Sequence, residues 1–95
     1  MVQLDRPLVD RFVESLATAR GFSGHTIRNY RSDLYQLLDY TSAQKVSEVA
    51  DLELEHLRGW LYQLAQAGAA RSTLARKSAS IRGFTAWLEH LGFLK

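Results

Sequence analysis

Apolar residues recur along this chain at the three- and four-residue spacing of an α-helix, in four separate stretches. The spacing predicts helices over about residues 6–20, 24–42, 53–67 and 72–91. No stretch shows the two-residue alternation that is typical of a β-strand. The predicted class is therefore all-α.

Residues that begin and end helices stand at the predicted boundaries. Pro7 suits the opening turn of the first helix, and the hydroxyl of Ser23 can cap the second. Gly21, Gly68 and Gly92 follow the first, third and fourth helices, where a residue with positive φ often ends a helix.

The longest connection covers residues 41–52, where we expect the second helix to fray near Thr41 and Ser42 and a short helical turn near 46–50. Because the other connections are short, the helices are expected to pack as two antiparallel hairpins. The predicted core consists of the apolar residues that share a helix face: Leu8, Phe12, Leu16, Ala19, Ile27, Tyr30, Leu34, Leu37, Leu38, Leu54, Leu57, Leu61, Leu64, Leu74, Ile81, Phe84, Leu88 and Leu91.

Composition narrows the class of protein further. A chain of 95 residues with 46% hydrophobic and 23% charged residues is an ordinary single domain and not a disordered segment. It has no cysteine, which excludes disulfides and thiolate metal sites, and no apolar run of about 18 residues or basic-then-apolar leader. We therefore expect a cytoplasmic protein that does not bind a membrane.

Catalytic and cofactor motifs are not found in this sequence. It has no glycine-rich phosphate loop, and His25, His56 and His90 lack the spacing of metal ligands. Glu53 and Glu55 are better explained as charges at a helix start than as an acid/base pair. We expect no enzymatic activity, cofactor, metal or small-molecule substrate for this chain.

Charge is unevenly distributed along the chain. Residues 41–70 carry four acidic and two basic residues, whereas residues 71–82 carry four basic residues and no acid. Such an asymmetry favours a polyanionic partner for the basic side.

Two predicted helices present hydrogen-bond donors on their outer faces. The second carries His25, Arg28, Asn29, Arg31, Ser32 and Gln36, and the fourth alternates arginines with small residues: Arg71, Ser72, Ala75, Arg76, Ala79, Arg82, Gly83 and Ala86. Small residues allow a backbone to approach a partner, and arginine binds phosphates or guanine edges bidentately. The pattern favours nucleic-acid binding over a basic solvated helix, and Gly83 marks either an approach to DNA or a helix crossing.

The same segments resemble the N-terminal core-binding domain of Xer-type tyrosine recombinases of the phage integrase family. The second helix carries that family's pattern as Ser23, Thr26, Tyr30 and Asp33-Leu34. The fourth carries it as Arg71-Ser72, Ala75-Arg76-Lys77 and Arg82-Gly83-Phe84. The resemblance covers essentially the whole chain, with one departure at Ser78, where the family commonly has leucine.

The resemblance implies a SAM-like orthogonal four-helix bundle of two crossed helical hairpins. Residues 1–95 would be the DNA-binding jaw of a clamp on double-stranded DNA, with the second and fourth helices facing the major groove. The catalytic domain, which supplies the tyrosine nucleophile, would lie outside this chain, so Tyr30, Tyr35, Tyr40 and Tyr62 have no such role.

The partners implied are double-stranded DNA and further protomers, of the same or a paralogous recombinase, in a DNA-bound tetramer, with residues 6–20 as a contact surface. The function implied is resolution of chromosome dimers. The expected DNA contacts are His25, Thr26, Arg28, Asn29, Arg31, Arg71, Ser72, Arg76, Lys77, Ser80 and Arg82. The alternative is a helical protein-interaction module that uses an exposed apolar or acidic surface near residues 48–55.

Overall fold

Four α-helices form close to the predicted positions in a computed structural model that describes residues 1–94. They are α1 (Arg6–Ala19), α2 (Gly24–Ala43), α3 (Leu54–Gln66) and α4 (Arg71–His90), with a short 3₁₀ turn, η1 (Val49–Asp51), before α3. The all-α prediction is confirmed. No helix among residues 1–94 is long and apolar enough to cross a membrane.

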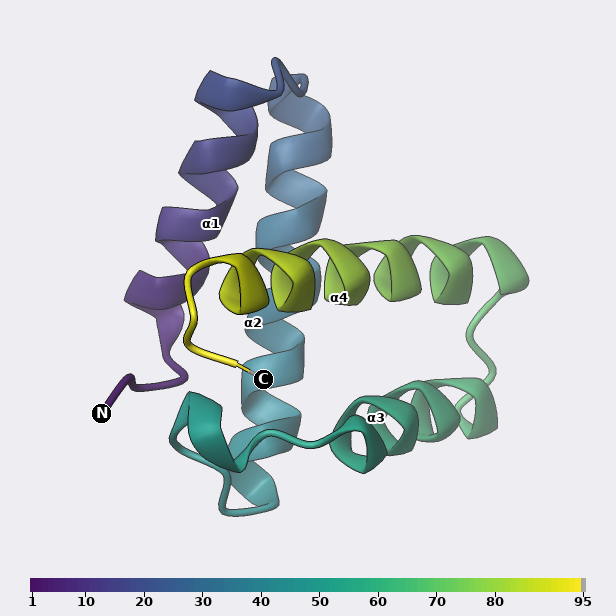
Figure 1. Cartoon of the computed structure of the whole chain (residues 1–95). Coiled ribbons are helices and arrows are strands. Elements are labelled where there is room, and N and C mark those ends of the chain that lie inside the picture. Colours follow the sequence, from purple (N-terminus) through teal and green to yellow (C-terminus); the bar gives the residue numbers. More distant parts are fainter. Residues whose placement is uncertain (95) are drawn as a thin grey trace.

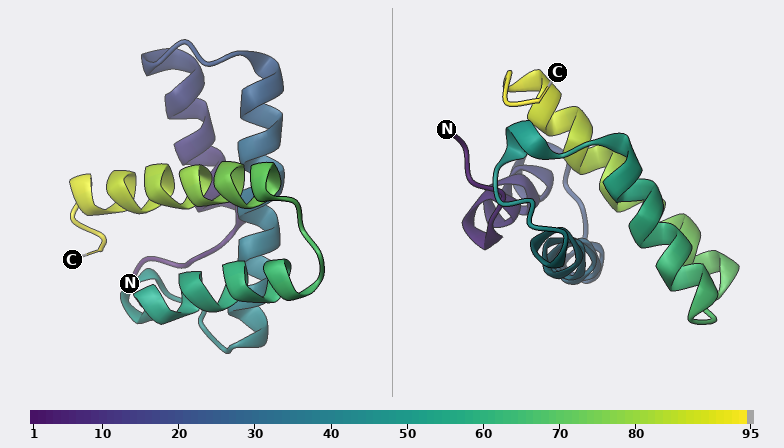
Figure 2. Two further views of the ribbon diagram at one scale, coloured as in Figure 1. Left: turned by 90° about the vertical axis from the view of Figure 1, so that its right-hand side faces the viewer. Right: turned by 90° about the horizontal axis from the view of Figure 1, so that it is seen from below.

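The helices form two antiparallel hairpins that cross. α1 lies beside α2, and α3 lies beside α4 across that first pair (Figure 1). The same crossing is visible from the side and from below (Figure 2). The predicted hairpin pairing is therefore correct, and the crossing brings α2 and α4 into direct contact.

The helix ends follow their capping residues. The Ser23 hydroxyl accepts a hydrogen bond from the Thr26 backbone N–H at 3.2 Å, which confirms it as the cap of α2. Gly21, Gly68 and Gly92 all have positive φ, as expected for residues that end helices.

The end of α2 differs from the prediction. Instead of fraying at Thr41, the helix continues to Ala43, and Thr41 is 1% exposed. Lys45 has a φ of 64°, and the N–H of Val46 donates to the carbonyl oxygen of Thr41 at 2.8 Å. This arrangement is a Schellman-type ending, closed by the buried Val46 side chain.

The core lies where the two hairpins cross. Phe12 of α1 contacts Phe84 and Trp87 of α4, with ring centroids 5.5 and 5.6 Å apart. The buried apolar residues are Leu4, Leu8, Val9, Phe12, Val13, Leu16, Leu34, Leu37, Leu38, Val46, Val49, Leu52, Trp60, Ile81, Phe84 and Leu88.

The predicted core is wrong at Leu54 of α3 and at two helix ends. Leu54 is 59% exposed, whereas Leu57, Leu61 and Leu64 pack against the core as predicted, and Trp60 is the buried residue of α3. Ala19 and Leu91 are also exposed, because they lie where α1 and α4 extend beyond the crossing. The remaining predicted core residues outside the buried set are half-buried: Ile27, Tyr30, Leu57, Leu61, Leu64 and Leu74.

Two glycines mark helix crossings. A Cβ on Gly83 of α4 would lie 3.3 Å from Cζ of Phe12 of α1. A Cβ on Gly59 of α3 would overlap the hydroxyl of Tyr40 of α2. Of the two explanations for Gly83, the structure supports the helix crossing.

The N-terminal segment, which the helical pattern does not cover, is paired with the connection after α2. The N–H of Leu4 donates to the carbonyl of Ser47 at 2.9 Å, and the N–H of Val49 donates to the carbonyl of Val2 at 3.0 Å. Leu4 is buried beneath this pairing.

Candidate nucleic-acid interface

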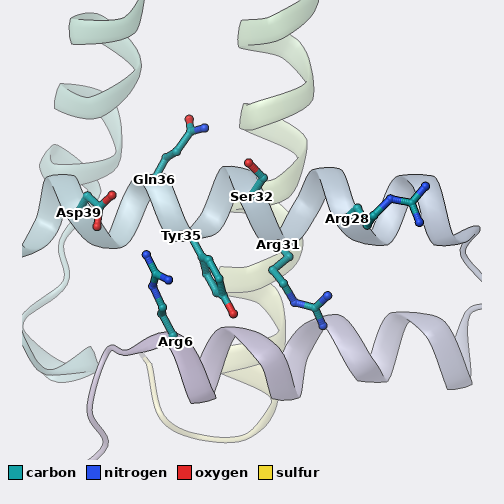
Figure 3. A pocket seen from close by; sticks show the side chains of 7 residues that line it. All are labelled: Arg6, Arg28, Arg31, Ser32, Tyr35, Gln36 and Asp39. Carbon is teal, nitrogen blue, oxygen red and sulfur yellow. The ribbon is translucent and has the colours of Figure 1, made fainter.

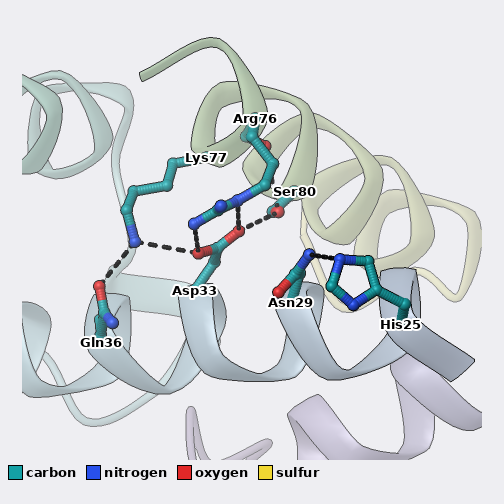
Figure 4. A network of polar contacts seen from close by, with 7 residues as sticks. All are labelled: His25, Asn29, Asp33, Gln36, Arg76, Lys77 and Ser80. Carbon is teal, nitrogen blue, oxygen red and sulfur yellow. Dashed lines mark hydrogen bonds and ion pairs between the residues drawn. The ribbon is translucent and has the colours of Figure 1, made fainter. Parts of the chain in front are cut away.

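One buried carboxylate joins α2 to α4 at their crossing. Asp33, 1% exposed, accepts hydrogen bonds from Arg76 Nε at 3.1 Å and Nη2 at 2.8 Å (Figure 4). It also accepts from Lys77 Nζ at 2.9 Å and from Ser80 Oγ at 3.1 Å. These four residues are called the Asp33 cluster below.

The helical register explains the cluster. Arg76 and Ser80 are one turn apart on α4, so both reach the same oxygen of Asp33. Burial acts to raise the pKa of Asp33, but hydrogen bonds from Arg76 and Lys77, the charge of Lys77 and the Ser80 hydroxyl together lower it. The carboxylate therefore stays ionised and compensates the cations beside it.

Lys77 is a core residue in this structure. Its side chain is 6% exposed, and Nζ donates to Gln36 Oε1 at 2.7 Å and lies 5.5 Å from the Trp60 ring centroid. Ser80 is fully buried. The expectation that these two residues contact DNA does not fit this placement, because both side chains are buried and bind Asp33.

Arg76 has a different environment. Its side chain is 42% exposed even though two of its nitrogens bind Asp33. Among residues 1–94, no hydrogen bond involves its third nitrogen, Nη1. Arg76 therefore presents a donor to solvent while the carboxylate fixes its orientation.

Other predicted residues lie on the surface of α2 near α4. His25 and Asn29 follow the same side of α2 as Asp33, and Asn29 Nδ2 lies 3.3 Å from His25 Nε2 (Figure 4). The Thr26 hydroxyl is already engaged at the start of α2, since it accepts a hydrogen bond from the Ser23 hydroxyl at 3.0 Å. On α4, Ser72 is exposed.

The remaining predicted arginines are not gathered at the crossing. Arg28 and Arg31 line a groove between α2 and α1, and Arg31 Nε donates to Asp10 at 3.2 Å. Arg82 lines an apolar groove between α4 and α3, and Arg71 is exposed at the first residue of α4. The predicted contacts thus divide into a crossing group, two flanking grooves, the exposed start of α4 and two buried residues.

The burial of two residues in this region is not among the predictions. Asp33 directly precedes Leu34 and lies one helical turn before Leu37, both core residues, so the helical register places it beside the core. Lys77, expected to contact DNA, follows Leu74 by three residues and precedes Ile81 by four, so the same register places it on the core stripe.

Comparison with known proteins agrees with this fold. The family model described as phage integrase, N-terminal SAM-like domain, matches residues 9–92. A tyrosine recombinase XerC of Corynebacterium glutamicum is 40% identical over 88 residues, covering 93% of this chain and 27% of the relative. A tyrosine recombinase XerC of Mycobacterium tuberculosis is 44% identical over 87 residues, covering 92% of this chain and 29% of the relative.

The chain therefore spans less than a third of the length of these curated relatives. No solved structure matches it. The resemblance to Xer-type recombinases and the expected SAM-like fold are confirmed. By the match over residues 9–92, this chain belongs to the family of phage integrase N-terminal SAM-like domains.

Proposed function

We propose that this chain is the DNA-binding domain of a Xer-type tyrosine recombinase and holds duplex DNA against α2 and α4. The observation that carries the proposal is the 40–44% identity with XerC recombinases over nearly the whole chain. Support comes from the exposed basic and polar side chains around the crossing of these helices.

The proposed contacts are the predicted residues with accessible side chains: His25, Thr26, Arg28, Asn29, Arg31, Arg71, Ser72, Arg76 and Arg82. Phosphate contacts would position the domain, and a few of these side chains would reach base edges. Lys77 and Ser80 would act indirectly, because they share the carboxylate that orients Arg76.

The activity of the longer protein is part of the same proposal. The relatives are tyrosine recombinases, so a catalytic domain would cleave and rejoin DNA through a 3′-phosphotyrosyl intermediate. The protein would work in the cytoplasm as a DNA-bound tetramer of the same or a paralogous recombinase and would resolve chromosome dimers. This chain would supply binding and no catalytic residue.

The test is fluorescence anisotropy with a labelled duplex of roughly 30 base pairs, about three helical turns. If about four phosphates are neutralised, log K should fall against log salt with a slope near −3.6. The variant Arg28→Glu/Arg71→Glu changes two exposed arginines that have no ion pair among residues 1–94. It should lose most of the affinity while its circular dichroism stays unchanged.

The matched control is Arg20→Glu/Arg58→Glu, which makes the same change in net charge just after α1 and on α3. Equal losses of affinity in both double variants would show that the duplex is attracted by the overall positive charge and does not bind a specific face on α2 and α4. A folded wild-type chain that does not bind the duplex at low salt would overturn the proposal.

One observation favours the second candidate, a helical protein-interaction module. Leu54 is 59% exposed and lines an apolar groove of about 220 Å³ between α3 and α4. If Leu54→Glu abolishes binding of a protein partner while duplex binding is absent in the wild type, this second function replaces the first.

A further inference from the structure

Three arginines from two helices line the groove between α1 and the outer face of α2. Arg6 opens α1, and Arg28 and Arg31 lie on α2, one helical turn apart. All three line an open groove of about 340 Å³ (Figure 3). Arg6 is not among the residues that the sequence pattern selects for DNA.

Tyr35 and Asp10 hold two of these arginines in place. Cζ of Arg6 lies 4.3 Å from the centroid of the Tyr35 ring. The Tyr35 hydroxyl donates to Asp10 Oδ1 at 2.6 Å, and Arg31 Nε donates to the same oxygen at 3.2 Å. A guanidinium that stacks by its face leaves its N–H edge available to an acceptor.

The tyrosine remains a hydrogen-bond donor at neutral pH. Its hydrogen bond to the Asp10 carboxylate raises the pKa of Tyr35 above the ordinary value. The hydrogen bond to Asp10 fixes the orientation of the Tyr35 ring, and the face of that ring contacts the Arg6 guanidinium. These side chains are therefore ordered before a ligand binds.

The charge of the groove favours an anion. Its lining contains the three arginines and one carboxylate, Asp39, while Asp10 is already engaged by Arg31 and Tyr35. The N–H groups along the edge of a guanidinium can donate two parallel hydrogen bonds to a phosphate, and these bonds are stronger than hydrogen bonds to a neutral ligand.

Gln36 connects this groove to the proposed DNA face. It lines the groove and also accepts the hydrogen bond from Lys77 of the Asp33 cluster. Two adjacent basic areas on one helix suit a ligand with repeated phosphates, which is the backbone of a nucleic acid duplex.

We infer that the α1–α2 groove binds a backbone phosphate of the duplex, with Arg6, stacked on Tyr35, as a DNA-contacting residue on α1. This inference rests on the proposed function and extends the DNA face from two helices to three. Tyr35 and Asp10 are positioning residues for it.

The test compares Arg6→Ala with Arg20→Ala in the same anisotropy assay. Both arginines are exposed on or just after α1, and each guanidinium lies near an aromatic ring, at 4.3 and 5.5 Å. Arg6→Ala should weaken binding about threefold or more and make the salt slope shallower by about 0.9, the loss of one phosphate contact. Arg20→Ala should leave the slope unchanged.

Equal effects of the two substitutions, with the wild type binding, would overturn this inference and leave the proposed function standing. A wild type that does not bind would overturn the proposed function first. Arg6→Lys keeps the charge without the planar fork, so it should keep the slope and lose affinity. Unchanged affinity in Arg6→Lys would overturn the role of stacking on Tyr35.

A nuclear magnetic resonance titration separates duplex from free anion. The Arg6 side-chain Nε resonance should shift with the duplex and stay in place with inorganic phosphate at the same ionic strength. Equal shifts with both would assign the groove to a free anion and overturn the duplex assignment.

Discussion

The guanidinium of Arg76 on α4 donates two hydrogen bonds to the carboxylate of Asp33 on α2, at 3.1 and 2.8 Å. The two residues are 43 positions apart in the chain and belong to different hairpins. Because Lys77 binds the same carboxylate, one buried group fixes both the helix crossing and an exposed arginine.

Replacing Asp33 should be costly because it leaves a buried cation. Asp33→Asn is expected to lower the free energy of unfolding by about 3–5 kcal/mol, the usual effect of removing one partner of a buried ion pair. Adding Lys77→Met should recover a large part of that loss, since the uncompensated ammonium is then gone. Urea unfolding of the wild type, both single variants and the double variant measures the coupling, and simply additive losses would contradict it.

The contribution of Asp33 should depend on pH in the acid range only. Since its pKa is lowered in the folded state, its ionised form stabilises the fold above the unfolded-state pKa of about 3.9. That stability is lost as the pH falls through the folded pKa. The gap in unfolding free energy between wild type and Asp33→Asn should be constant between about pH 6 and 8 and shrink from about pH 4 downward. A gap that is unchanged at the lowest pH at which both fold would refute this assignment.

Filling the groove between α3 and α4 should stabilise the domain. Ser78 lines this groove of about 220 Å³ with Leu57, Leu61 and Ile81. Ser78→Leu is expected to raise the free energy of unfolding by about 0.5–1 kcal/mol and the melting temperature by a few degrees. Ser78→Ala is the matched control, because it changes helix propensity without filling the groove. An equal gain in both variants would attribute the effect to propensity.

Gly83 should resist the substitution that normally improves a helix. Glycine to alanine inside a helix usually gains about 0.5–1 kcal/mol. Here the new Cβ would lie 3.3 Å from Phe12, which is buried between Phe84 and Trp87 and has little room to move. Gly83→Ala should therefore give no gain in melting temperature.

The exposed residue Ala86 on the same helix supplies the reference for that prediction. Ala86→Gly should show the ordinary loss of about 0.5–1 kcal/mol. A clear rise in the melting temperature of Gly83→Ala would mean that α1 and α4 can separate slightly at this crossing.

Most of the helices could be read from the sequence because each carries its own local signals. The spacing of Leu8, Phe12 and Leu16 needs only one helix to be recognised, and Ser23 and Gly21 act within a few residues of themselves. The most deeply buried residue of α3 could not be predicted in the same way. Its leucines and Trp60 lie on adjacent faces, and the choice between them depends on how α2 and α4 approach.

The candidate site likewise has one part that local sequence predicts and one part that depends on how the hairpins pack. The exposed donors of α2, such as His25 and Arg28, follow from the helical register alone. The pairing of Asp33 with Arg76 and Lys77 arises only when the hairpins cross. Residue type alone therefore favours DNA contact for all the basic residues equally. Direct contact of the exposed ones with DNA stays a prediction.

The pairing of the N-terminal segment with the loop before η1 changes where the folding unit begins. The family match starts at residue 9, and the first helix starts at Arg6. A truncated domain cut at either point would lose the two backbone hydrogen bonds of Val2 and Leu4 and uncover the core above Val49. In expression and cloning, the boundary should therefore follow the hydrogen bonds, and the first four residues should be kept with the helices.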